Sequence, residues 1–139
     1  MSRFTHWLMP AMTVYAHCDV PCGIYDPHGA ELAARTVARM VELIGQLPKE
    51  SLSEADRAKF VRCIAIKEQH AEIVKHEIQV IWSDYFKPEH LERYPDLHDR
   101  TWKILKLASK NKQNIDAAAA AELEAAVKEY ADIFWSTKK

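Results

Sequence analysis

The sequence predicts an all-α protein, an antiparallel four-helix bundle with an irregular N-terminal segment. Only three glycines occur in 139 residues, strand-like alternation is scarce, and four amphipathic stretches are joined by short links. A chain of this length most simply forms one domain. Four such helices cover one another's apolar faces most simply as an antiparallel bundle.

Prolines and capping residues bound the first two helices. Asp26 is expected to cap the first helix with Pro27 at its first position, and the helix stops near Pro48. The stretch 51–54 contains a capping-box pattern, and a helical period then continues to Pro88. The second helix is therefore expected to be long, about 33 residues.

The third helix is expected to open at Pro95 and Asp96 and to end in the cationic stretch 106–112. Asn114 or Asp116 can cap the fourth helix, which begins with a run of alanines, strong helix formers. The apolar positions expected to face the core are Leu32, Val37, Met40, Val41, Ile44, Leu47, Phe60, Cys63, Ile66, Ile73, Val74, Val80, Ile81, Leu97, Ile104, Leu105, Ala108, Leu123, Val127, Tyr130 and Phe134.

Charge and cysteine content exclude several classes of protein. Lys and Arg number 19 and Asp and Glu 20, without long blocks of either sign, so we expect no nucleic-acid partner and no basic membrane patch. No apolar run approaches the roughly 20 residues that span a bilayer, so a soluble protein without membrane contact is expected. Three cysteines, an odd number, do not suggest a secreted disulfide framework, and Cys63 is interpreted as a buried apolar residue.

Residues 1–16 differ from the rest and are interpreted as a cleavable leader. Val14 and Ala16 resemble a signal-peptidase site, but the apolar region is short and is interrupted by His6, Pro10 and Thr13. A removable leader of another kind is therefore favoured over a secretory signal. Cleavage after Ala16 would make residue 17 the amino terminus.

The stretch HCDVPCGIYDP, residues 17–27, carries the unusual chemistry. Cys18 and Cys22 could form a disulfide or be incidental thiols. A structural zinc site needs four donors, so Asp19 or a distant histidine would have to join His17 and the two cysteines.

Removal of Ala16 would add a donor, because the free amine of His17 has a reference pKa of about 7.7–8.0. That amine, the peptide nitrogen of Cys18 and the Cys18 thiolate can bind one metal through two fused five-membered rings. The Cys22 thiolate closes the square, and the His17 imidazole reaches the metal from above the plane. Planar nitrogen and sulfur donors indicate nickel(II) or copper(II), and because thiolates tend to reduce copper(II), nickel is the best remaining choice.

HCDVPCGIYDP closely resembles the amino-terminal metal-binding hook of nickel superoxide dismutase. The block from Ile66 to His98 resembles the second helix and following turn of that family, and FWSTKK resembles its carboxyl end. The resemblance implies a nickel cofactor and the conversion of superoxide to oxygen and hydrogen peroxide by Ni(II)/Ni(III) cycling. It also implies a homohexamer of four-helix bundles, a dedicated leader-processing peptidase and a location in the bacterial cytoplasm.

Carried onto this chain, the resemblance makes His17, Cys18 and Cys22 the nickel ligands. Tyr25 matches the hook tyrosine near the open axial face, where it would limit access to small anions. Asp19 matches a position that shapes the hook.

Tyr85 and Lys87 match residues near the family's site, where the lysine would attract an anion and the tyrosine would order its hydrogen bonds. The alternative for both is ordinary surface at a helix end.

Two positions depart from the family's pattern. The Glu and Arg that commonly hold the metal-bound imidazole fall on Ala33 and His70, and Glu31 is the nearest carboxylate in sequence. Because such partners orient metal-bound imidazoles, the axial geometry here is expected to be looser or to be held differently. His70 is interpreted as a satisfied core histidine rather than a partner of His17. A rival from another class is a nickel or copper carrier that uses the same hook without turnover.

Overall fold

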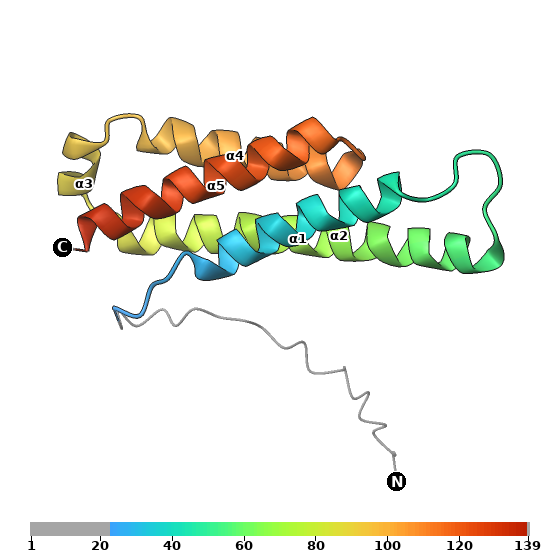
Figure 1. Cartoon of the computed structure of the whole chain (residues 1–139). Helices are drawn as coiled ribbons and strands as arrows, with labels where there is room; N and C mark the ends of the chain where they lie inside the picture. The colour runs from blue at the N-terminus through green and yellow to red at the C-terminus, as the bar shows by residue number, and fades with distance from the viewer. Residues whose placement is uncertain (1–22, 139) are drawn as a thin grey trace, which may run out of the picture.

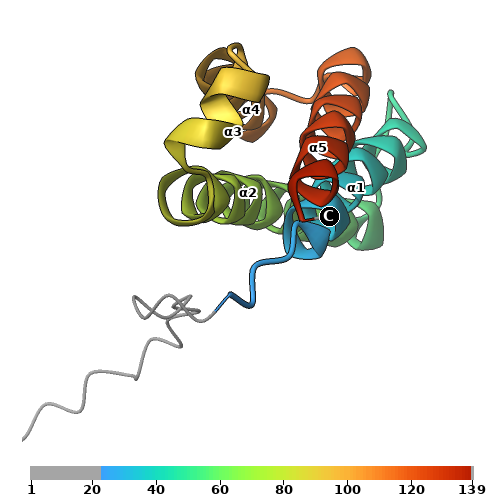
Figure 2. The same ribbon diagram turned by 90° about the vertical axis from the view of Figure 1, so that its left-hand side faces the viewer.

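The computed structural model describes residues 23–138, and these form a bundle of four long helices, as predicted (Figure 1). The long helices are α1 (His28–Gly45), α2 (Glu54–Val80), α4 (Leu97–Gln113) and α5 (Ala117–Thr137). No strand occurs among the described residues. Helix α1 packs against α2 and α5, and α4 also packs against α2 and α5, so the four helices form a ring when viewed along the bundle (Figure 2).

Successive long helices run in opposite directions, so one end of the bundle collects segments that are far apart in the sequence. The start of α1, the end of α2, the start of α4 and the end of α5 all lie at this end (Figures 1 and 2). Residues 23–27 join the bundle there, at the start of α1. The end of the predicted hook therefore meets the carboxyl end of the described chain.

The end of α2 contains two features that hydrophobic periodicity did not predict. A π-helical turn (η1, Ile81–Tyr85) extends α2, with the amide of Phe86 donating to the carbonyl of Ile81 at 3.2 Å. A short helix, α3 (Pro88–Arg93), then precedes α4. The long second helix was thus predicted almost to its end, but its last turn is widened, as often occurs near functional sites.

Helix starts agree with the predicted caps to within two residues. The Asp26 carboxylate accepts from the amide of His28 at 2.8 Å, and the helix begins at His28 rather than at Pro27. Ser53, not Ser51, caps α2 in a reciprocal capping box with Asp56. Of the two candidates for α5, Asp116 is the cap, accepting from the amide of Ala119 at 3.0 Å.

Small residues line the face of α1 that packs into the bundle. Ala30, Ala33, Ala34, Val37 and Val41 are buried at helical spacing. The prediction that Leu32 faces the core is wrong, because its side chain is 53% exposed. It lies two residues from Ala30 and from Ala34, about 200° around the helix from each, and so faces away from the core.

The core is built around large apolar side chains from the other three long helices, and Ile66, 37% exposed, is not among them. Cys63 is a buried free thiol, as predicted. Among the largest fully buried side chains are Tyr130, Phe134, Ile78, Ile81, Leu97, Ile104 and Leu123.

A lysine is buried where α2 meets the turn between α4 and α5. Lys67 is 1% exposed, and its ammonium donates to the carbonyls of Asn111, Lys112 (3.0 Å) and Asn114 (3.1 Å). These carbonyls belong to the last turn of α4 and the residues after it, where a helix has unpaired acceptors and the negative end of its dipole. Burial lowers the pKa of Lys67, and the charge of Glu68 opposes that shift.

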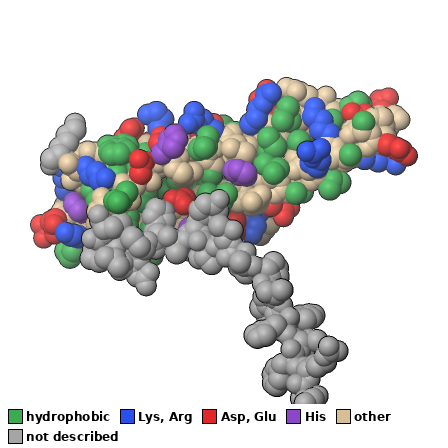
Figure 3. Space-filling view, turned by 90° about the horizontal axis from the view of Figure 1, so that it is seen from below, with side chains coloured by type: hydrophobic (Ala, Val, Ile, Leu, Met, Phe, Trp, Pro, Cys, Tyr) green, Lys and Arg blue, Asp and Glu red, His purple; other side chains and the backbone are tan. Residues whose placement is uncertain are grey.

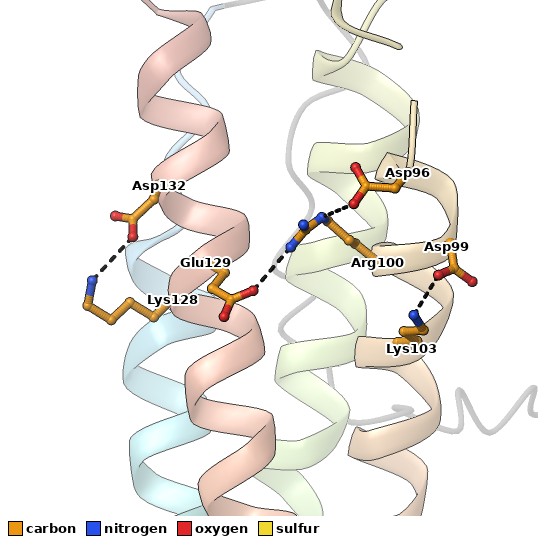
Figure 4. Close-up of polar contacts among 7 residues, drawn as sticks. All are labelled: Asp96, Asp99, Arg100, Lys103, Lys128, Glu129 and Asp132. Atoms are coloured by element: carbon orange, nitrogen blue, oxygen red, sulfur yellow. Dashed lines mark hydrogen bonds and ion pairs between the residues drawn. The ribbon is translucent and has the colours of Figure 1, made fainter. Parts of the chain in front are cut away.

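Ion pairs lie on the exposed sides of α4 and α5 (Figure 4). Arg100 bridges the two helices by pairing with Asp96 at 2.7 Å and with Glu129 at 3.1 Å. Such exposed pairs contribute at most about 1 kcal/mol each. Within residues 23–138, no helix combines the length and the apolar character that a membrane crossing needs.

Candidate metal centre

Four of the predicted site residues, His17, Cys18, Asp19 and Cys22, lie outside the described residues. The described chain starts at Gly23, whose φ of 70° lies in the left-handed region. Glycine adopts this conformation without the steric cost that a Cβ imposes. The turn that leads towards the bundle at residue 23 is therefore one that glycine favours.

Tyr25, three residues after Cys22, is anchored in the bundle. It is 8% exposed, and its ring lies 5.7 Å from that of Tyr85 at a tilt of 56°. Its carbonyl accepts a hydrogen bond of 2.8 Å from the ammonium of Lys138. Tyr25 thus fixes the point at which the predicted hook joins the folded domain.

Tyr85 lies at the centre of an aromatic cluster on the π-helical turn. The centre of its ring lies 4.4 Å from that of Phe134 and 5.6 Å from that of His90, on which it stacks. Its hydroxyl lies 2.9 Å from that of Thr137, which is in turn 2.6 Å from the carbonyl of Phe134. Because the threonine hydrogen is directed to that carbonyl, Tyr85 donates to Thr137, and its oxygen remains available as an acceptor.

Lys87 has a different setting from the two tyrosines. It is exposed, and its backbone amide donates to a ring nitrogen of His90 at 3.0 Å. It borders a small hollow of about 210 Å³, lined also by Trp82, Ser83, Phe86, Pro88, Leu91 and His98. The structure therefore brings Tyr25 and Tyr85 into contact and places Lys87 beside a neighbouring hollow.

The two departures from the family's pattern have different structural outcomes. Ala33 is buried in the core and offers no polar group. His70 is half-buried, and its Nδ1 lies 2.9 Å from the carbonyl of Ile66, one turn earlier. A carbonyl only accepts, so His70 carries a proton on Nδ1 and that nitrogen is paired within its own helix, although the residue lies at the edge of the core rather than in it.

A carboxylate that sequence reasoning did not select lies against the start of α1. Glu77 of α2 is so close to Gly29 that a Cβ placed on that glycine would lie 3.2 Å from the carboxylate. Because residue 29 has no side chain, the carboxylate of Glu77 can lie against the backbone at the start of α1. Spacing along the chain pointed to Glu31 instead, since the contact with Glu77 exists only in the folded bundle.

The carboxyl end of α5 contributes three further residues that were not selected as site residues. Phe134 packs on Tyr85, Thr137 accepts from its hydroxyl, and Lys138 holds the carbonyl of Tyr25. In the sequence, the resemblance of FWSTKK to the family's carboxyl end was the only sign of these residues. Hydrophobic periodicity indicated Phe134 alone, and only as a core residue. The partners are separated by 113 residues in the case of Tyr25 and Lys138, so no local pattern links them.

Fold and site define a class: a helical bundle whose N-terminal segment, bearing a histidine and two cysteines, is anchored beside a tyrosine cluster. The family described as nickel-containing superoxide dismutase matches residues 12–138. Curated superoxide dismutases [Ni] from Streptomyces coelicolor and Streptomyces seoulensis are 41% and 40% identical over 131 residues, 94% of each chain. The solved native structure of nickel superoxide dismutase covers 88% of this chain and 100% of its own, with a TM-score of 0.79 and 40% identity.

The chain belongs to the nickel-containing superoxide dismutase family. It is an oxidoreductase with nickel as its cofactor and superoxide as its substrate. The prediction of family, enzyme class and cofactor is confirmed.

Proposed function

We propose that removal of residues 1–16 creates the nickel site of this superoxide dismutase. The mature domain then comprises residues 17–139, with the hook at 17–25 and the bundle at 26–139. The donors are the amine and imidazole of His17, the amide nitrogen and thiolate of Cys18, and the thiolate of Cys22. A set of nitrogen and thiolate donors suits nickel(II).

The composition of the bundle supports this choice of donors. Among the described residues, no group of three or more His, Cys, Asp or Glu side chains could hold a metal. The one described cysteine, Cys63, is buried in α2. The stretch 17–22 is therefore where we expect the donors of a nickel enzyme to lie.

When bound, nickel supplies a one-electron couple between Ni(II) and Ni(III), so that two superoxide ions and two protons give one oxygen and one hydrogen peroxide. Around it, Asp19 shapes the turn of the hook, and Tyr25 limits access to small anions. Tyr85, whose own hydrogen is directed to Thr137, orders water by accepting a hydrogen bond from it. Lys87, exposed and positively charged, attracts the superoxide anion.

We further propose that the mature protein is a homohexamer in the bacterial cytoplasm and that a dedicated peptidase removes the leader. Association would bury large apolar side chains that the single chain leaves exposed. They include Leu32, Val61, Trp82, Trp102 and Trp135. Apolar side chains are visible among charged ones on the described part of one face of the bundle (Figure 3). Mass photometry of processed protein would test the assembly by giving six chains per particle.

The ligand scheme is tested by comparing protein that begins at His17 with protein that begins at Ala16. We expect the first to bind one nickel per chain, to show a nickel(III) electron-paramagnetic signal and to accelerate superoxide decay. The second has an amide in place of the amine, so it should lack dismutase activity. A matched control carries one extra residue after Lys139 and should behave like the first.

Two results would contradict the scheme. Full activity in protein that retains residues 1–16 would exclude the amine as a ligand. Stoichiometric nickel binding by the His17 form without faster superoxide decay would favour a carrier over an enzyme with this hook.

A further inference from the structure

The last described residues make two polar contacts to the pair of tyrosines. Thr137 contacts Tyr85, and Lys138 contacts Tyr25. The ammonium of Lys138 lies 2.8 Å from the carbonyl oxygen of Tyr25. The same ammonium lies over two aromatic rings of α5, 4.9 Å from the ring centre of Phe134 and 5.4 Å from that of Trp135. The ring contacts hold the ammonium in place, and a charged donor strengthens the hydrogen bond to the carbonyl.

The carbonyl that Lys138 holds belongs to Tyr25, the last residue of the proposed hook. Cys22 precedes Tyr25 by three residues, and Gly23, with its positive φ, lies between them. Beyond Tyr25 the chain passes through Asp26 into α1. A contact that fixes the backbone at Tyr25 therefore limits the positions open to the thiolate of Cys22.

The same turn of α5 also holds Tyr85, because Thr137 accepts from its hydroxyl and Phe134 packs on its ring. The rings of Tyr25 and Tyr85 touch each other at 5.7 Å. The end of α5 and the residue after it thus hold the backbone of Tyr25 and the hydroxyl of Tyr85.

We propose that Lys138 is a positioning residue for the nickel hook: by holding the carbonyl of Tyr25 it fixes the base of the hook and slows nickel release. The inference rests on the proposed function, because it takes Cys22 as a ligand. It assigns to the carboxyl terminus a role at a site formed by the amino terminus.

The test compares Lys138→Met and Lys138→Arg in the processed protein that begins at His17. Lys138→Met keeps length and loses the donor, so we expect nickel release to a chelator to be roughly tenfold faster, the usual effect of losing a hydrogen bond from a charged donor. Lys138→Arg keeps a charged donor and should restore slow release. Lys128→Met is the matched control, since Lys128 is an exposed lysine within α5 and pairs with Asp132 instead.

Deuterium uptake by peptides covering residues 23–30 gives a second readout that needs no metal. We expect Lys138→Met to accelerate uptake there in the nickel-free protein, while the melting temperature of the helices remains that of the parent. Parental nickel release in Lys138→Met would overturn the positioning role, whether or not uptake changes. Failure of the parent protein itself to bind nickel would instead overturn the proposed ligand set.

Discussion

Replacing Lys67 by Met should destabilise the whole bundle, even though it exchanges a buried charge for an apolar side chain of similar length. The ammonium of Lys67 serves three carbonyls at the end of α4. Asn111 is fully buried and Lys112 partly so, whereas Asn114 is exposed, so water can replace the lysine only at the last of these. Lys67→Met therefore leaves two carbonyls without a donor.

The magnitude follows from the cost of unpaired buried acceptors, about 1–3 kcal/mol each. Part of this loss is offset, because methionine does not incur the desolvation penalty that lowers the pKa of Lys67. We expect a net loss of about 3 kcal/mol in the free energy of unfolding. For a domain of this size, that corresponds to a fall of roughly 10 °C in melting temperature.

Thermal unfolding followed by circular dichroism measures this change, with Lys103→Met as the control. Lys103 is an exposed lysine of α4 paired with Asp99, and its loss should cost less than about 1 kcal/mol. Nickel release at 25 °C should be unaffected in both variants, because the contact is in the bundle and not at the hook. A Lys67→Met protein as stable as its parent would refute the reasoning, showing that relief of desolvation outweighs the lost hydrogen bonds.

The remaining predictions concern pH and surface charge. Burial raises the pKa of Tyr130 to about 12 from the ordinary value of 10.0, so its contribution to stability is complete below pH 10 and is lost as the pH rises towards 12. We expect the free energy of unfolding to fall between pH 10 and pH 12 in the parent and to fall less in Tyr130→Phe. Unfolding at alkaline pH, followed together with the absorbance of tyrosinate, measures this difference. The hydrogen bonds from Ser53 lower the pKa of Asp56, so the capping box contributes above the ordinary pKa of 3.8 and is lost as the pH falls through the folded value. Acid unfolding should therefore be less steep in Asp56→Asn, and an unchanged profile would contradict this assignment. Arg100→Met should change the melting temperature by only a few degrees and lose its effect at high salt, since both of its pairs are exposed.

The sequence was sufficient for the four long helices because their signals are local. The cap at Asp116, the end of the second helix before Pro88 and the apolar spacing of α5 each depend on a few neighbouring residues, and the structure confirms them. Local patterns failed where packing decides which face is buried. Leu32 is more apolar than Ala33, but alanine allows close approach of α1 to its neighbours, so the leucine faces outwards.

The chemistry proposed for the hook likewise follows from the sequence alone, because a histidine and two cysteines in six consecutive positions are neighbours in any fold. The anchoring of that hook is not. Tyr25, Tyr85 and Lys138 come from the beginning, middle and end of the bundle, and antiparallel packing of the helices is what brings them to one end. The proposed donor atoms are specified by adjacent residues, whereas the surface to which their segment is anchored is specified by contacts between residues distant in the chain.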